Sequence, residues 1–225
     1  MKTHKSKISV SGILKASNRR NVIAKGLIET GNDNWLMVRK ESDNAIIAIS
    51  KYCRVKDVSF TSNGREKFTI LDWPNKNVVA SVTALPDSRS RFSNVQYNVG
   101  AVLTFDYKTK KLTVNPGGIV VNAGFDSNNK LKNGEYLIFQ ADFPHEFGDS
   151  YMHLSSYSKT WFFIKDDDNL NRYLHIGSMS LGCLTIGVNG SDSDRRRWND
   201  IAPLLLTQRI AQNDSYIGKL IVKGA

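Results

Sequence analysis

The stretch Arg172-Tyr-Leu-His-Ile-Gly-Ser-Met-Ser-Leu-Gly-Cys-Leu-Thr-Ile186 combines a histidine, a Ser-x-Gly-Cys turn and an apolar run. A thiol becomes a useful nucleophile when a base takes its proton and donors stabilise the oxyanion that its attack creates. His175 is a candidate base for Cys183, and Gly182 lets backbone N–H groups around Cys183 approach a carbonyl oxygen. The alternative is a buried structural cysteine on a strand, since free cysteine is among the most buried residue types.

The composition is that of a globular protein with an excess of positive charge. The 225 residues are 40% hydrophobic and 23% charged, and 31 Lys and Arg against 21 Asp and Glu give a net charge of +10. Such a balance predicts an anionic neighbour, whether nucleic acid, membrane surface or cell-wall polymer. Only Arg195–Arg197 forms a tight basic run, and no basic stripe is interleaved with aromatic residues, so we expect no nucleic-acid interface.

Cysteine count and hydropathy exclude several further classes. The two cysteines, Cys53 and Cys183, lie far apart, which excludes a disulfide-rich scaffold. Nothing approaches the roughly 20 apolar residues of a transmembrane helix. Residues 1–10 are basic but lack the apolar core of a secretory signal. We therefore expect no transmembrane segment and no Sec signal in this chain.

The spacing of apolar residues predicts a mainly β protein in two parts. Residues 1–95 contain short apolar runs joined by polar turns and form an N-terminal β-rich module of unknown role, while residues 96–225 form the second domain. In the module, strands over residues 22–29 and 35–39 flank the Gly- and Asn-rich segment 30–34, which predicts a hairpin. The polar residues 86–91 are the predicted linker.

From Gly100 onward the expected strands are longer. A hairpin is predicted over residues 102–115, and further strands are predicted over residues 119–124, 133–140, 160–165 and 216–222. Between two of these strands lies a long loop, residues 141–158, which is rich in His, Asp, Ser, Tyr and Phe. Loops of that length inside a domain are usually functional or disordered, and the aromatic residues favour order.

A helix is predicted near the C-terminus. Ser191–Asp194 offers residues that cap a helix N-terminus, and Trp198, Ile201, Leu204 and Leu205 recur at helical spacing. A proline inside a helix costs about 3 kcal/mol. We therefore expect the helix to begin near Asp200, so that Pro203 falls in the first turn, where its missing N–H does no harm.

Four segments carry a family resemblance: Leu103-Thr-Phe-Asp106, Asn133-Gly-Glu-Tyr-Leu-Ile138, Thr160-Trp-Phe162 and the stretch quoted above. Through them, residues 100–210 resemble the catalytic domain of YkuD-like L,D-transpeptidases, in a divergent branch. The family signature is a histidine, a spacer and then Ser/Thr-x-Gly-Cys followed by an apolar residue, which Ser180-Leu-Gly-Cys-Leu184 fits. The chain departs from the pattern twice: its spacer is about half as long as in many members, and Thr185 stands where arginine is frequent.

The resemblance implies a mixed β-sheet catalytic domain with a flanking C-terminal helix. It also implies a cysteine enzyme without a metal or other cofactor, which cleaves or exchanges a D-amino-acid amide of the peptidoglycan stem peptide as a transpeptidase or carboxypeptidase. Cys183 would form a thioester, His175 would carry the proton, and the backbone N–H groups of Gly182 and Cys183 would hold the oxyanion. Ser180 either orients the base or is a turn residue.

Substrate contacts are expected on both sides of this segment. Thr185 occupies the position where the family often has arginine, and Arg172 could bind the substrate carboxylate in its place. Trp161 and His153 are further candidates, for which the alternatives are a core tryptophan and an exposed loop histidine.

Three other functions are open to the same residues. His145, His153, His175 and Cys183 are a chemically reasonable zinc set, but no H-x-x-x-H or C-x-x-C pair occurs. A Ser-His-Asp hydrolase lacks its Gly-x-Ser-x-Gly elbow. A non-catalytic basic β module that binds an anionic polymer, cell wall or nucleic acid, is the alternative of a different class.

The expected site of action is the cell wall or periplasm. One route is delivery by a secretion apparatus as a wall-targeting effector, with a secretion-system or immunity protein as partner. The other is a Sec signal that has been removed from the chain.

Overall fold

The strands of the C-terminal part alternate buried and less buried residues, and they pair with one another into a closed barrel. The computed structural model describes residues 22–126, 128–166, 171–178 and 182–225. In this described part the closed barrel has the strand order β10 (Ile119–Gly124), β14 (Leu184–Ile186), β13 (Arg172–Ile176), β12 (Phe162–Lys165), β11 (Gly134–Ala141), β16 (Tyr216–Lys223), β8 (Ala101–Asp106) and β9 (Lys111–Asn115). The predicted mainly β fold with a C-terminal helix is confirmed.

Two of the barrel's strand pairs are parallel. β16 runs parallel to β8, and β13 runs parallel to β14, with His175 opposite Thr185. Because β13 and β14 point the same way, the chain must return from the end of β13 to the start of β14. Cys183, which directly precedes β14, is therefore brought beside the beginning of β13 rather than its end. The parallel pairing places the cysteine next to Tyr173.

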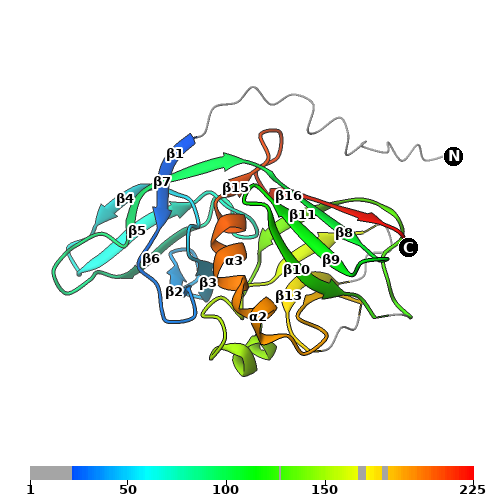
Figure 1. Cartoon of the computed structure of the whole chain (residues 1–225). Coiled ribbons are helices and arrows are strands. Elements are labelled where there is room, and N and C mark those ends of the chain that lie inside the picture. Colours follow the sequence, from blue (N-terminus) through cyan, green and yellow to red (C-terminus); the bar gives the residue numbers. More distant parts are fainter. Residues whose placement is uncertain (1–21, 127, 167–170, 179–181) are drawn as a thin grey trace, which may run out of the picture.

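Helices cover one side of the barrel (Figure 1). α2 (Asp192–Arg196) is capped by Ser191, whose side chain accepts from the N–H of Asp194, as the sequence predicts. α3 (Trp198–Leu206) begins two residues before the predicted start, so Pro203 lies inside the helix. The helix persists because its apolar face belongs to the barrel core, where Trp198, Ile201 and Leu205 are fully buried. No described helix is long and apolar enough to cross a membrane.

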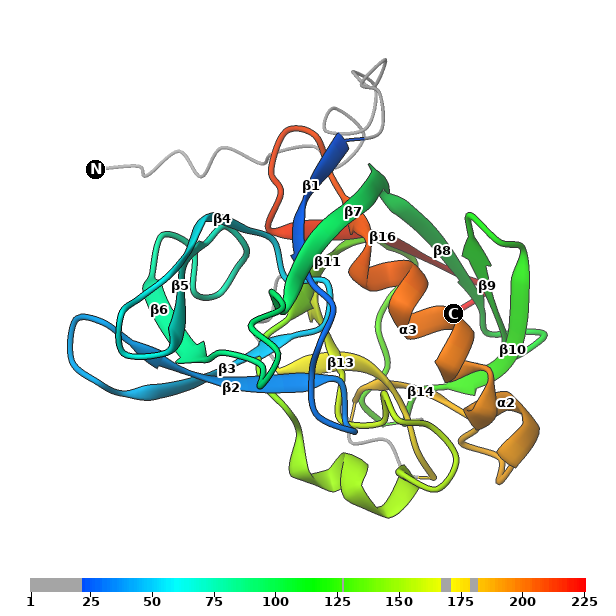
Figure 2. The ribbon, with the colours of Figure 1, turned by 90° about the vertical axis from the view of Figure 1, so that its left-hand side faces the viewer.

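The N-terminal part forms a second layer beside the barrel (Figures 1 and 2). Its five-stranded antiparallel sheet has the order β3 (Ile46–Ser50), β2 (Trp35–Lys40), β6 (Val79–Thr83), β5 (Arg65–Ile70) and β4 (Val55–Phe60). This sheet has a core of its own, which includes Val38, Ile49, Phe68 and Ala80. A β-rich N-terminal part is thus present in the described residues.

A third sheet joins the two parts. In it β7 (Phe92–Val99) pairs with β1 (Val22–Leu27) on one side and with β15 (Gln208–Arg209) on the other. The boundary expected between residues 95 and 96 therefore falls inside β7. The hairpin expected over residues 22–39 does not form, because β1 pairs with β7 and β2 pairs with β3 and β6. Both differences come from pairings between distant segments.

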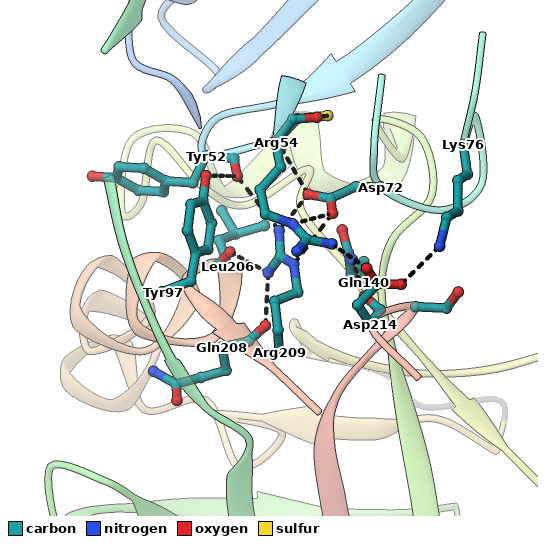
Figure 3. A network of polar contacts seen from close by, with 12 residues as sticks. Tyr52, Arg54, Asp72, Lys76, Tyr97, Gln140, Leu206, Gln208, Arg209 and Asp214 are labelled. Atoms are coloured by element: carbon teal, nitrogen blue, oxygen red, sulfur yellow. Dashed lines mark hydrogen bonds and ion pairs between the residues drawn. The ribbon is translucent and has the colours of Figure 1, made fainter. Parts of the chain in front are cut away.

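One buried carboxylate holds the two parts together (Figure 3). The side chain of Asp72 is 2% exposed. Its carboxylate accepts from Arg54 of the N-terminal part, with 2.7 Å between Arg54 Nε and Asp72 Oδ1, and from Arg209 of the C-terminal part. Arg54 also pairs with Asp214 at 2.7 Å, and Lys76 pairs with Asp214 at 3.0 Å. Burial alone would raise the pKa of Asp72, but Arg209 and Arg54 lower it, so the net shift is below its usual value.

Replacement of Asp72 by Asn should remove about 3 kcal/mol from the free energy of unfolding, because it leaves Arg54 and Arg209 buried without their shared anion. Chemical denaturation of the intact chain measures this loss. The matched control is Asp87→Asn, which removes the exposed pair with Arg89 and should have a much smaller effect on stability. Equal effects from the two substitutions would contradict the role of Asp72.

Candidate active site

The candidate site lies on the outer face of the β12–β13–β14 wall. Leu174, Ile176, Leu184 and Ile186 point into the barrel core. Since alternate residues of a strand face opposite sides, Tyr173, His175 and Thr185 face outward. Phe163 is opposite Tyr173 on the neighbouring strand, and Thr185 is opposite His175. The sequence-predicted base is therefore beside a strand that begins directly after the predicted nucleophile.

Cys183 is half-buried, with its sulfur against the backbone of β13. The N–H of Tyr173 donates to Cys183 Sγ at 3.4 Å. Burial raises the pKa of this thiol, and the N–H of Tyr173 and the charge of Arg172 lower it in part, with a net rise. At neutral pH the residue is thus a protonated thiol that already has a donor placed to stabilise its thiolate.

Arg172 fixes the turn before Cys183. Its guanidinium is buried and donates to Asp166 Oδ2 at 2.5 Å, to the carbonyl of Gly182 at 2.8 Å, and to both Asn129 O at 2.6 Å and Oδ1 at 2.8 Å. Gly182 has φ of +106°, and a Cβ there would lie 2.6 Å from Asn129 Nδ2 and 2.9 Å from Arg172. Only glycine fits this position without displacing the anchor.

His175 is held as a neutral imidazole. Its Nδ1 lies 2.7 Å from the carbonyl of Ile176, and its Nε2 lies 3.3 Å from Thr185 Oγ1. A carbonyl can only accept, so Nδ1 carries the hydrogen and Nε2 presents its lone pair. Burial, aided by His145 and opposed by the Ile176 carbonyl, lowers the pKa of His175 from 6.5 to about 4. The ring is therefore neutral at pH 7, with its lone pair facing Thr185 Oγ1.

A stack of four rings connects His175 to the surface. Trp161 lies between His175 (centroids 4.1 Å apart, planes at 15°) and His145 (4.3 Å, 7°). Two rings this close to one indole would overlap on the same face, so the histidines lie on opposite faces. Phe143, 51% exposed, stacks on His145 at 4.3 Å. Trp161 is thus a wall of the site rather than a core residue.

Asp142 is a hub that the sequence did not single out. One of its carboxylate oxygens lies 3.1 Å from His145 Nε2, and the other accepts from the hydroxyl of Tyr173 at 3.0 Å. Asp142 and His145 belong to the segment that the sequence predicts as a functional loop, which contains the 3-10 helix η1 (Glu146–Tyr151). The sequence places Asp142 and His145 three residues apart in this loop, which could have indicated that they interact. Only the tertiary structure brings Tyr173 to them.

The remaining predicted residues lie outside this cluster or outside the described residues. Ser180 lies outside the described residues. His153 is exposed and makes no hydrogen bond, ion pair or ring contact within the described part of the chain. Among these residues no group of three or more His, Cys, Asp or Glu is placed to hold a metal ion, and the zinc set is divided by Trp161. For Arg172, the contacts above favour positioning over substrate binding, which stays a prediction.

Comparison with known proteins finds no matching family model and no similar curated protein. Among solved structures, L,D-transpeptidase 1 of Mycobacterium tuberculosis is 11% identical over 71% of this chain and 70% of that chain, with a TM-score of 0.35. L,D-transpeptidase 3 of the same organism is 11% identical over 96% and 88%, with a TM-score of 0.36. The L,D-transpeptidase of Xylanimonas cellulosilytica is 13% identical over 66% and 72%, with a TM-score of 0.33.

Likenesses at these identities and TM-scores carry no assignment of fold, family or activity.

The buried His175 should make the stability of the protein depend on pH. Because its folded pKa of about 4 lies below 6.5, the unfolded chain binds a proton between these values that the folded chain does not. The contribution of neutral His175 to the free energy of unfolding is fully present above pH 6.5. As the pH falls toward 4, the free energy of unfolding decreases by roughly 1.4 kcal/mol per pH unit, about 3 kcal/mol in all. Denaturation at pH 7 and pH 4.5 should show this loss, and His175→Gln should remove most of it.

Cys183 should react slowly with an alkylating reagent near pH 7 in the absence of substrate. Its raised pKa keeps the thiolate fraction low, and Cys53 is buried with a pKa also raised by burial. Labelling rates followed by intact-protein mass spectrometry from pH 6 to pH 10 measure this. Reaction at pH 7 faster than that of a free cysteine in a model peptide would contradict a resting thiol.

Proposed function

We propose that the protein is a cysteine acyltransferase or peptidase that acts on a D-amino-acid amide of the peptidoglycan stem peptide through a Cys183 thioester. The observation that carries the proposal is the placement of the two residues on one face of neighbouring strands. His175 is neutral with its lone pair on Nε2, 3.3 Å from Thr185 Oγ1, and it lies diagonally across the β13–β14 pair from a thiol that accepts the N–H of Tyr173. Diagonal neighbours across a strand pair are within reach of a long side chain.

In the first step, His175 Nε2 takes the proton of the Cys183 thiol while the sulfur attacks the amide carbonyl carbon. A C–S bond forms and the carbonyl oxygen becomes an oxyanion. The imidazolium then gives its proton to the nitrogen of the departing D-amino acid as the C–N bond breaks. The hydrogen bond from Nδ1 to Ile176 O keeps the ring in the tautomer that this exchange requires.

Oxyanion stabilisation follows from the anchored turn. Arg172 binds the carbonyl of Gly182, which fixes the peptide plane between Gly182 and Cys183. In a trans peptide the N–H points away from the C=O, so the N–H of Cys183 is directed away from the buried guanidinium. A preorganised backbone donor next to the attacking sulfur is the arrangement that stabilises a tetrahedral intermediate. Arg172 therefore acts in this proposal as a positioning residue.

The fate of the thioester defines the activity. Transfer to an acceptor amine is transpeptidation, transfer to a free D-amino acid is exchange, and transfer to water is carboxypeptidase activity. The choice of peptidoglycan as substrate rests on the sequence resemblance of residues 100–210, and the net charge of +10 is compatible with an anionic wall. Action in the cell wall or periplasm follows from that substrate.

Incubation of the protein with muropeptides should release or exchange a terminal D-alanine. Mass spectrometry of the muropeptides measures this change. Cys183→Ala should abolish this activity, and His175→Gln should reduce it by about 10²-fold or more, because general acid–base catalysis typically contributes that much. Circular dichroism of both variants checks that they fold.

A matched control is Cys53→Ala, which removes the other thiol of the chain, buried in the N-terminal core. It should keep wild-type activity per folded molecule. Activity that survives Cys183→Ala would rule out the thioester. Absence of activity in the wild type together with binding to wall polymer would favour the non-catalytic alternative.

A further inference from the structure

The second histidine of the ring stack is arranged like a base. The side chain of His145 is 9% exposed, and its Nε2 lies 3.1 Å from Asp142 Oδ1. Its Nδ1 makes no hydrogen bond to any described residue. The function proposed above uses His175 only and gives this buried pair no role.

The contact with Asp142 sets the tautomer of His145. An ionised carboxylate can only accept, so Nε2 carries the hydrogen and the lone pair is on Nδ1. A carboxylate on one imidazole nitrogen and a free lone pair on the other is the arrangement in which Asp–His pairs act as general bases. The carboxylate also stabilises the imidazolium that forms when Nδ1 takes a proton.

Tyr173 connects this pair to the nucleophile. Its hydroxyl donates to Asp142, its ring contacts His145 edge-on at 4.7 Å, and its backbone N–H donates to Cys183 Sγ. Burial, followed by the negative charge of Asp142, raises the pKa of Tyr173, so its phenol stays protonated and keeps Asp142 in place. The thiol and the Asp142–His145 pair thus lie on two sides of one tyrosine.

The order of the rings places the two histidines on opposite faces of Trp161. Along the stack the rings run Phe143, His145, Trp161 and His175. Phe143 is 51% exposed and Phe147 of the same segment is 84% exposed, so His145 is the histidine at the end of the stack that is next to exposed aromatic side chains. The lone pair of His175 faces Thr185 on the barrel wall.

We propose that Asp142 and His145 form a second acid–base pair, which activates the acceptor amine that opens the Cys183 thioester. The inference rests on the proposed thioester chemistry. The acceptor nitrogen attacks the thioester carbon, a C–N bond forms, and the C–S bond breaks with the electron pair going to sulfur. His145 Nδ1 takes the proton that the nitrogen loses and later releases it to solvent, while the Cys183 thiolate regains a proton from solvent.

The test separates formation of the thioester from its opening. Wild-type protein and His145→Phe are acylated with a stem tetrapeptide, and intact-protein mass spectrometry follows the adduct before and after addition of D-alanine or hydroxylamine. Phenylalanine keeps a ring on Trp161 but has no nitrogen. We expect acylation within about twofold of wild type and opening by D-alanine slowed by about 10²-fold.

Hydroxylamine distinguishes a lost base from disturbed packing. It is already uncharged near neutrality, so its attack needs little help from a base, and it should open the His145→Phe adduct within a few-fold of the wild-type rate. Asp142→Asn should slow D-alanine in the same selective way. The matched control Asp149→Asn alters an exposed carboxylate of the same segment, which pairs with Lys159, and should leave both rates unchanged.

Each outcome decides one of the two proposals. Opening of the His145→Phe adduct by D-alanine at the wild-type rate, or equal slowing with both nucleophiles, would overturn the second acid–base pair. Absence of any Cys183 adduct in the wild type would instead overturn the proposed function, before a variant is compared.

Discussion

The buried guanidinium of Arg172 is the contact on which one end of the barrel depends. It binds Asp166, which follows β12, Asn129, which precedes β11, and the carbonyl of Gly182, which precedes β14. Removal of one partner from a buried pair of this kind costs several kcal/mol, because the other charge is left without compensation. The contact therefore holds three connections at once, and the place of Cys183 is set by the barrel rather than by a free loop.

The N-terminal part contributes to the same site through the segment between β11 and β12. Asn34 donates to Ser156 O at 3.1 Å and to Ser156 Oγ at 2.9 Å, and Lys159 lies 3.6 Å from Asp33. This segment carries Asp142 and His145 and ends at Trp161. Together with the ion pairs of the buried Asp72, these contacts attach the N-terminal sheet to the barrel. The sheet thereby supports the segment between β11 and β12, which packs over His175.

The parts of this arrangement that the sequence predicts are local. The hairpin of β8 and β9 follows from alternation and a short turn, and one motif predicts His175 as the base for Cys183. The join through β7 was missed because its partners, β1 and β15, are distant in sequence. The position of Pro203 inside α3 was not predicted. Burial of Trp198 begins the helix two residues earlier than the helix propensity of the sequence indicates. Asp142 and His145 needed the tertiary structure, since only folding brings Tyr173 and Trp161 to them.

Burial acts on both members of the proposed catalytic pair, and it disfavours charge on each. It raises the pKa of Cys183 and lowers that of His175, so a thiolate–imidazolium pair is opposed from both sides at rest. The neutral pair costs little to bury and does not attract stray electrophiles. In the proposed reaction, charge would develop only while the sulfur attacks, and the N–H of Tyr173 and the fixed Gly182–Cys183 peptide would stabilise it. Burial thus keeps the resting residues neutral, while the backbone donors already in place would stabilise the charge that attack creates.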